Sequence, residues 1–487
     1  MVVSSCLGLP VSATEAETTT DTTAASTSPS DTTGETAETS EPTTPPVTGP
    51  QEITGYVASD VDFGNYSAKG YSGPEDYTAD AKAALLIELS TDSIAYAMNP
   101  DERVYPASLT KVMTCLLALE YGNLEDEVTA TETALDLDVS GSGMKLQVGE
   151  TLKLEDLLNG LMVASANDAA MVIAEHIGGS IDAFVELMNQ KAQELGCQNT
   201  HFANPHGLHD ENHYTTARDM AIIFKAALKY DKFQEIYQTT RCVIEATNLS
   251  EARTLVTTNY LTGTIITSQY YDKRVIGGKT GFTTPAGRCV ICTAEDDDIT
   301  YLCVIMGAES YDAEGSVYYG SFVEASQLLD YGFNSFMVEN ILSPLSPVAQ
   351  LAVAEALESV VVTPKSNVTT ILPKGFDTET IEIRYDLDSD TGLTAPLEAG
   401  QVVGTVGAYI AGGCVASTDL VTMTAVERHA VQAQINETAS SLASSPWAIV
   451  MIVSGVLLAV LLILVVRAQI IRSTRKKRRE KRRKVSQ

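Results

Sequence analysis

The stretch Pro106-Ala-Ser-Leu-Thr-Lys-Val-Met-Thr-Cys-Leu-Leu-Ala-Leu-Glu120 joins a serine and a lysine, three residues apart, to an apolar run. The apolar residues recur at helical spacing and a proline stands just before them, so the sequence predicts a helix that begins near Ser108. Ser108 and Lys111 share one face of this helix. Ser108 would lie in the first turn, where free N–H groups and the helix dipole favour a developing anion. The stretch therefore predicts a serine nucleophile with a lysine beside it.

The pattern Ser-x-x-Lys also occurs at Ser142–Lys145 and at Ser473–Lys476, because so short a pattern arises easily by chance. The first of these copies is broken by glycines, which weaken a helix. The second lies in a basic tail. Only Ser108 is followed by a helical run, so we predict that Ser108 is the reactive serine.

Two further motifs follow in order along the chain, Ser165-Ala-Asn167 and Lys279-Thr-Gly281. Ser165 stands between two apolar helical segments, where a short loop can point polar groups inward. An ordinary helix N-cap is the alternative interpretation of this motif, since Ser and Asn favour that position.

The stretch around Lys279 precedes two runs of β-forming residues, 289–294 and 300–306, which an acidic hairpin turn separates. An edge strand that carries Lys279 and Thr280 can pair with an extended peptide, and the two side chains can hold its terminal carboxylate. Gly281 allows the backbone to come close. A glycine-rich turn before a strand is the alternative interpretation. All three motifs, in order and within about one domain's length, favour an active site.

The residue types fit a nucleophile whose base is a lysine. A hydroxyl is a poor nucleophile at neutral pH and needs a base within hydrogen-bond reach. Lys111 can be that base only if its pKa falls, which burial beside a second cation achieves, and Lys279 is the candidate for that cation. We expect Ser165 to relay a proton to the leaving amine, and Asn167 to bind the substrate's amide or to hold the lysine.

With these motifs the chain resembles the serine-type D-Ala-D-Ala carboxypeptidases, the low-molecular-mass penicillin-binding proteins. The resemblance extends over about residues 76 to 425 and includes stretches outside the motifs. These stretches are 79–88 and 92–99 (an opening strand pair), 141–146, 200–208, 213–221 and, in a second domain, 393–404.

The resemblance implies a two-step acyl transfer without a cofactor. Ser108 would attack the carbonyl between two D-alanines of a peptidoglycan stem peptide, and water activated by Lys111 would free the shortened peptide. Backbone N–H groups of Ser108 and Phe282 would hold the oxyanion, each worth about 3 kcal/mol. β-Lactams would trap the acyl-enzyme, and the role would be in cell-wall maturation.

One departure from the family concerns the substrate carboxylate. Some members use an arginine downstream of the Lys-Thr-Gly strand to help bind it, whereas here no Lys or Arg occurs between Arg288 and Lys365. We therefore expect carboxylate binding by Lys279 and Thr280.

Four other functions compete with a carboxypeptidase. A D,D-endopeptidase would use the same site, and a catalytically idle wall-binding module would not need every motif residue. A class A β-lactamase needs a glutamate for deacylation, and its candidate, Glu186, lies in a continuous helical pattern. A zinc enzyme is suggested by four histidines between residues 201 and 213, but the Asn-Pro-His-Gly stretch among them argues for a loop and we predict no metal.

The C-terminal part indicates a membrane anchor. Residues 447–466 are uncharged and mostly aliphatic, long enough to cross the hydrocarbon core, and they begin with the chain's single tryptophan. Residues 467–487 form a basic tail, in which eleven Lys and Arg face one acid. Positive charge marks the cytoplasmic side, so we predict a single-pass protein with its C-terminus inside and its catalytic domain outside.

The charge of the remaining chain argues against nucleic acid as a partner. The protein has 32 Lys and Arg against 63 Asp and Glu, and without the tail 21 basic residues face 62 acidic ones. Such an acidic ectodomain repels nucleic acid and favours solubility at a cell surface.

We predict a mixed α/β catalytic domain at 76–340, with an antiparallel sheet and helices as in β-lactamases and transpeptidases, and a small all-β domain at 347–425. A juxtamembrane stalk (426–446) leads to one transmembrane helix. At the other end, residues 14–75 are rich in Thr, Ser, Glu and Pro and predict a disordered spacer. Residues 1–13 predict the remnant of a signal peptide, with lipidation at Cys6 as the alternative.

Overall fold

The computed structural model describes residues 49–51, 53, 55–58, 77–135, 141–389, 391–444 and 446–485. The predicted signal-peptide remnant and nearly all of the predicted spacer lie outside the described residues.

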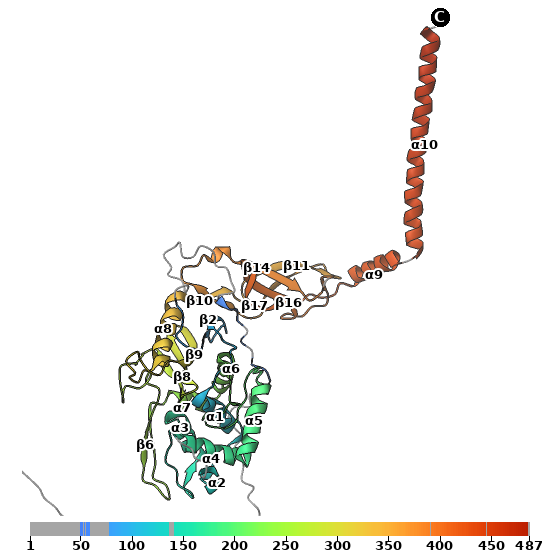
Figure 1. Cartoon of the computed structure of the whole chain (residues 1–487). Coiled ribbons are helices and arrows are strands. Elements are labelled where there is room, and N and C mark those ends of the chain that lie inside the picture. The colour runs from blue at the N-terminus through green and yellow to red at the C-terminus, as the bar shows by residue number, and fades with distance from the viewer. Residues whose placement is uncertain are drawn as a thin grey trace, which may run out of the picture. The chain divides into compact units, whose positions relative to one another are not determined.

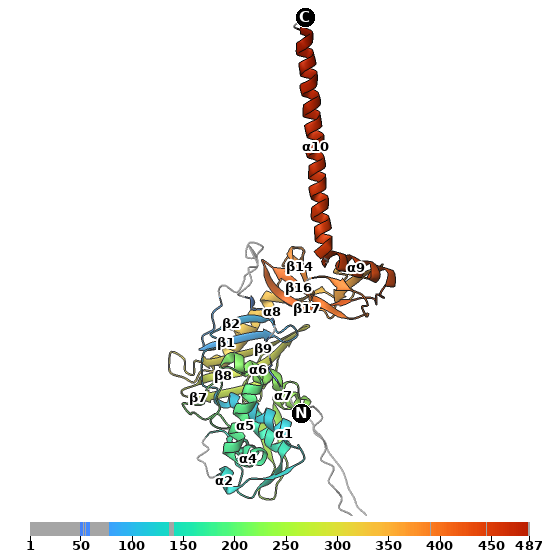
Figure 2. The same cartoon turned by 90° about the vertical axis from the view of Figure 1, so that its right-hand side faces the viewer.

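A five-stranded antiparallel sheet forms the centre of the region predicted to be catalytic (Figure 2). Its order is β2-β1-β9-β8-β7, so β7 is an edge strand, as the sequence predicts. The strands are β1 (Ala83–Glu88), β2 (Ile94–Met98), β7 (Val275–Thr283), β8 (Gly287–Asp296) and β9 (Ile299–Ala308). The acidic turn is shorter than predicted, because β8 runs on through Asp296 before the chain reverses at Asp297, whose φ is 51°.

Alternate side chains of these strands enter two different cores. On one face of the sheet they pack with α8 (Gly320–Ser335), and on the other they pack with the remaining helices of the region. Successive residues of a strand point to opposite faces, so a strand segment buried on both sides must be apolar, as β9 is from Leu302 to Met306. Figure 1 shows the helices of the second face, which are α2 (Glu132–Leu135), α3 (Leu154–Val163), α4 (Asn167–Gly178), α5 (Ile181–Glu194), α6 (Ala217–Ala227) and α7 (Asp231–Gln238). Two short hairpins, β3 (Glu127–Thr129) with β4 (Thr151–Lys153) and β5 (Arg241–Ile244) with β6 (Arg253–Val256), complete the region.

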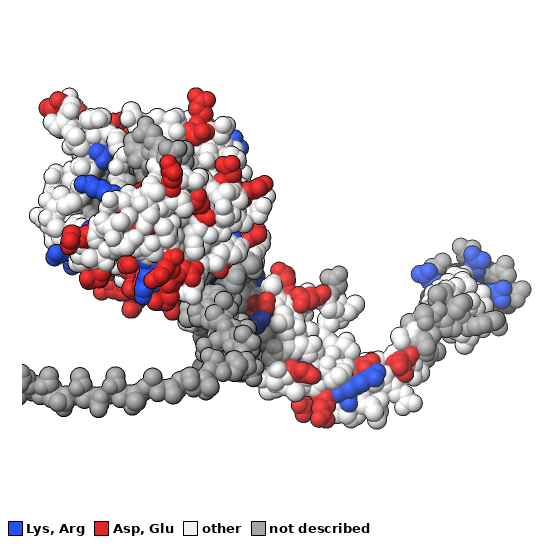
Figure 3. Space-filling view, turned by 90° about the horizontal axis from the view of Figure 1, so that it is seen from below, with Lys and Arg blue, Asp and Glu red and all other residues white. Residues whose placement is uncertain are grey.

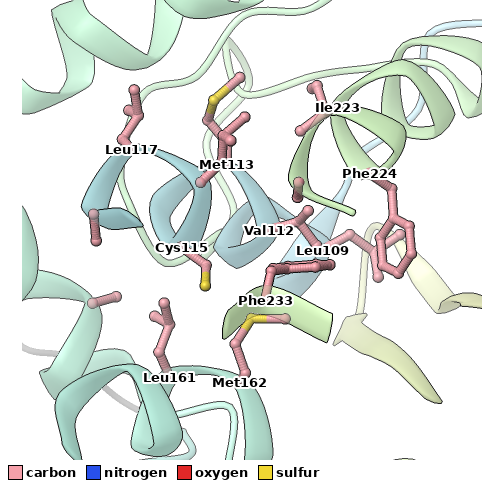
Figure 4. Packing of buried hydrophobic residues seen from close by; sticks show 14 of the residues in the cluster. Leu109, Val112, Met113, Cys115, Leu117, Leu161, Met162, Ile223, Phe224 and Phe233 are labelled. Atoms are coloured by element: carbon pink, nitrogen blue, oxygen red, sulfur yellow. The ribbon is translucent and has the colours of Figure 1, made fainter. Parts of the chain in front are cut away.

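The helix predicted after Ser108 is α1 (Lys111–Tyr121), and it is enclosed by other elements. Every residue from Lys111 to Glu120 is buried, which fits a helix that is apolar on all sides. Figure 4 shows its surroundings, in which Leu161 and Met162 of α3, Ile223 and Phe224 of α6, and Phe233 of α7 pack around Val112, Met113, Cys115 and Leu117. Ser108 itself precedes α1, in a 3₁₀ turn (η4, Ala107–Thr110), because the chain tightens there before the α-helix begins.

The C-terminal region consists of β-strands, which confirms the predicted fold class. Six strands pair in the order β14-β16-β17-β12-β11-β15, and β10 pairs with β13. β10 crosses the predicted end of the catalytic domain at residue 340. Their bounds are β10 (Phe336–Leu342), β11 (Ala349–Ala354), β12 (Ser359–Pro364), β13 (Val368–Pro373), β14 (Glu382–Leu387), β15 (Leu393–Thr394), β16 (Val402–Ile410) and β17 (Gly413–Thr422), with a 3₁₀ turn at Thr378–Thr380.

Two helices end the chain, α9 (Ala430–Ser444) within the predicted stalk and α10 (Pro446–Val485). Within α10, residues 453–475 have a mean hydropathy of 2.4 and are long and apolar enough to cross a membrane. This segment overlaps the predicted span 447–466 and begins a few residues later.

Candidate active site

Ser108 lies in a tight turn, and Gly207 and Gly281 pack closely against its backbone. Ala107, just before it, has a φ of 48°, in the left-handed region that few residues other than glycine adopt. A Cβ atom on Gly281 of β7 would lie 3.0 Å from the Ser108 nitrogen, and one on Gly207 would lie 1.9 Å from the Ala107 oxygen. The third motif therefore needs glycine because its backbone passes directly over the serine turn.

Lys111 contacts the serine hydroxyl from inside the protein. Its Nζ lies 2.9 Å from Ser108 Oγ, 2.7 Å from Asn167 Oδ1 and 2.7 Å from the His206 carbonyl oxygen. The side chain is fully buried. Burial and the neighbouring charge of Lys279 lower the pKa of Lys111 well below its ordinary value, against a smaller opposing effect of Asp168. A lysine in such surroundings favours the neutral amine that a base requires.

Lys279 holds the second serine in the same way. Its Nζ lies 2.8 Å from Ser165 Oγ and 2.8 Å from the Thr280 carbonyl oxygen. Burial lowers the pKa of Lys279 to about 7. Ser165 occupies the short loop between α3 and α4 with a φ of 56°, so the predicted loop between two helices is confirmed.

A cavity of about 340 Å³ opens in front of these groups. Ser108, Ser165 and Asn167 line it together with Thr280, Gly281 and Phe282 of the edge strand β7, and the two lysines lie buried behind. The Thr280 hydroxyl lies 2.6 Å from that of Thr258, which fixes the threonine side chain. All eight residues singled out in the sequence thus meet at one place, around Ser108. The cavity has the geometry of a serine acyl-transfer site beside an edge strand.

The histidine-rich stretch supports the serine turn from behind. His213 Nδ1 accepts from the Ala203 amide at 3.0 Å, so its Nε2–H donates to the Thr110 hydroxyl at 2.7 Å, and this hydroxyl donates to the Ala107 carbonyl. Burial lowers the pKa of His213 to about 3, so the ring is neutral. Among the residues the structure describes, no group of three or more His, Cys, Asp or Glu is arranged to hold a metal ion.

Three groups at the site are additions to the sequence-based prediction. The His206 carbonyl accepts from Lys111, Asp168 receives the Met144 and Leu146 amides beside the cavity, and Arg288 lines the cavity. The stretch 200–208 resembles the family, so the sequence points to the neighbourhood of His206. It does not predict that the His206 carbonyl faces Lys111, because the fold sets the direction of a carbonyl. Glu186, the residue considered for a β-lactamase, is exposed within α5.

Comparison with known proteins agrees with this geometry. The family described as D-alanyl-D-alanine carboxypeptidase matches residues 69–310, and the penicillin-binding protein 5 C-terminal domain matches residues 341–428. A Bacillus subtilis protein named D-alanyl-D-alanine carboxypeptidase DacF is 32% identical over 333 residues, 67% of this chain and 81% of the relative. A Haemophilus influenzae protein named D-alanyl-D-alanine carboxypeptidase DacA is 33% identical over 354 residues, 70% of this chain and 84% of the relative. The crystal structure of penicillin binding protein 5 from Haemophilus influenzae is similar with a TM-score of 0.61 and 32% identity, over 73% of this chain and 100% of that one.

The chain belongs to the D-alanyl-D-alanine carboxypeptidase family. It is therefore a serine-type hydrolase, and the family, the fold class and the enzyme class predicted from the sequence are confirmed.

Proposed function

We propose that this chain removes the terminal D-alanine from peptidoglycan stem pentapeptides through an acyl-enzyme on Ser108. One observation carries the proposal: a buried amine, Lys111, lies 2.9 Å from the serine hydroxyl and has a lowered pKa. A neutral amine at that distance takes the hydroxyl proton as the oxygen bonds to the carbonyl carbon.

The remaining motif residues have separate roles in this reaction. Backbone N–H groups of Ser108 and Phe282 bind the oxyanion of the tetrahedral intermediate. Ser165, held by Lys279, passes a proton to the amine of the leaving D-alanine. Asn167 fixes the Lys111 amine and the substrate's amide. Water then attacks the ester with Lys111 as its base, which releases the shortened peptide, and no cofactor takes part.

The substrate peptide lies along β7 in this proposal, with its terminal carboxylate toward Lys279, Thr280 and Gly281. β-Lactams, which imitate the D-Ala-D-Ala end, acylate the same serine and inhibit the enzyme. Nucleic acid is no partner, since acidic side chains dominate the charged groups on the face seen in Figure 3.

The enzyme acts at the outer face of the cell membrane. The apolar helix within α10 spans the bilayer, the basic residues 467–487 lie in the cytoplasm and the catalytic region lies outside. Residues 76–340 form the catalytic domain, 347–425 the small β-rich domain and 426–446 the stalk.

A direct test feeds a pentapeptide that ends in D-Ala-D-Ala to the purified chain and to Ser108→Ala. We expect D-alanine release by the first alone, and covalent labelling of Ser108 by penicillin. Rapid β-lactam turnover without D-alanine release would replace the proposal with a β-lactamase. Cleavage of a cross-linked dimer in preference to the pentapeptide would replace it with a D,D-endopeptidase.

A further inference from the structure

Arg288 differs from every other described residue that lines the cavity, because it alone is charged. The two active-site lysines lie behind the cavity wall, and each already donates to neighbouring oxygens. Asp and Glu are absent among the described lining residues. The cavity therefore presents one cation to a ligand and no anion.

Two aromatic rings hold the Arg288 guanidinium in place. Arg288 pairs directly with Phe282 across the tight β7–β8 hairpin, and its Cζ lies 4.3 Å from the centre of the Phe282 ring. The same carbon also lies 4.2 Å from the centre of the Tyr319 ring. Aromatic rings contact a guanidinium through its flat face, and such contacts leave its N–H groups, which lie in its plane, to bind a ligand.

The guanidinium also lacks a polar partner. Its Nε is buried without a hydrogen bond, and no hydrogen bond or ion pair links the group to the described part of the chain. The side chain as a whole is half-buried, and a partly desolvated cation is costly unless an anion completes its surroundings. Acidic residues are abundant elsewhere in this protein, so the absence of one here leaves room for an anion from the substrate.

Lys279 is poorly suited to carry the full charge of a bound carboxylate. Its side chain is buried, its Nζ already donates to two oxygens, and its pKa falls to about 7. At neutral pH a large part of the population therefore has no charge on this amine. Arginine keeps its charge throughout the physiological range and matches a carboxylate with two parallel hydrogen bonds.

We infer that Arg288 binds the terminal carboxylate of the substrate and thereby selects peptides with a free C-terminus. This inference rests on the proposed function and extends it. The peptide would then run along β7 from Ser108 toward the hairpin, where Phe282 and Tyr319 hold the guanidinium that binds its carboxylate.

The test compares two substrates with the same acyl part. One is the peptide acid that ends in D-Ala-D-Ala, and the other is the methyl thioester of the shortened peptide, whose leaving group has no carboxylate. For Arg288→Gln we expect kcat/KM on the acid to fall about 10- to 100-fold, mainly through KM, and on the thioester less than about 2-fold. Arg288→Lys keeps the charge without the planar fork and should fall between the wild type and Arg288→Gln.

Arg103→Gln is the matched control. Arg103 also stacks on an aromatic ring, 4.5 Å from the centre of Tyr214, but lies outside the cavity. This variant should leave both rates unchanged. Melting temperatures of all variants identify any that fail to fold. Should Arg288→Gln fail to fold, the test uses Arg288→Lys and the ratio of its kcat/KM on the acid to its kcat/KM on the thioester. A lower ratio than in the wild type supports the inference, and an equal ratio overturns it.

Equal losses on the acid and the thioester in Arg288→Gln would overturn the inference, since a purely structural arginine affects both substrates alike. The proposed function would stand in that case. A wild-type enzyme that releases no D-alanine from the acid would instead refute the proposed function, and the inference with it.

Discussion

Helix α1 meets a buried lysine at each of its two ends, and the two lysines behave in opposite ways. At its start, the Lys111 amine faces neutral oxygens and a second lysine, and its pKa is lowered. At its end, Glu120 receives the Lys191 ammonium of α5 at 2.6 Å, and Glu194 receives it at 2.8 Å. Burial by itself lowers the pKa of Lys191, but the two carboxylates raise it. A buried lysine therefore becomes a base or a fixed cation according to the charges of its nearest partners.

The strongest test of this difference removes the base. In Lys111→Met the side-chain volume is nearly kept but the amine is lost, so we expect acylation of Ser108 to slow by about 10²- to 10⁴-fold. Stopped-flow measurement of thioester consumption reports the rate. A rate within a factor of three of the wild type would show that another group serves as the base.

The second test removes the fixed cation. Lys191→Met leaves the Glu120 carboxylate buried without its partner, so we expect a loss of about 3 to 5 kcal/mol in the free energy of unfolding. Unfolding in urea measures this loss. The acylation rate of the folded fraction should be unchanged, because Lys191 is absent from the cavity lining. A slower folded enzyme would contradict the separation of the two lysines.

The third test concerns pH. Lys279→Met removes the cation that helps to keep the Lys111 amine neutral, so the pKa of Lys111 should rise. The rising limb of kcat/KM for the thioester should then shift to higher pH. Lys191→Met supplies the control, with an unshifted limb.

The variant Lys279→Met also tests how the lowered pKa of Lys279 makes the free energy of unfolding depend on pH. Lys279 has a pKa of about 7 when folded and an ordinary value, near 10.5, when unfolded, so the unfolded chain binds more protons between these limits. Relative to Lys279→Met, the wild type should gain stability from pH 7 to pH 10, by at most about 1.4 kcal/mol per pH unit. A constant difference between the two unfolding free energies over this range would show that Lys279 keeps its proton.

The smallest expected effect belongs to the double variant Lys191→Met with Glu120→Leu. Apolar side chains replace both members of the buried pair, so most of the stability lost in the single variant should return, to within about 1 kcal/mol of the wild type or above it. Urea unfolding of the single and double variants gives the difference. A loss equal to that of Lys191→Met alone would attribute the effect to packing.

Local sequence predicted the parts of the site whose geometry is local. The spacing of Ser108 and Lys111, the loop at Ser165 and the edge strand at Lys279 each follow from a few neighbouring residues. Their convergence follows from the family resemblance, since periodicity does not say which loop meets which strand. The predicted span 447–466 lies within α10, which continues into the basic residues because hydropathy marks an apolar segment and does not say where a helix ends.

Arg288 escaped prediction because its role depends on two partners of different origin. Phe282 faces it through the hairpin register, which the sequence alone does not fix to one residue. Tyr319 comes from beyond β9, and only the tertiary structure brings its ring to the guanidinium.

Because α1 is buried from Lys111 to Glu120, the activity of the enzyme depends on the folding of the whole catalytic region. A helix without an exposed face has no route to fray on its own, so its amides should exchange with deuterium only when the entire catalytic region opens. Gradual heating should therefore yield a mixture of fully competent and fully inert molecules. The fraction that fluorescent penicillin labels would then count the folded molecules in a sample.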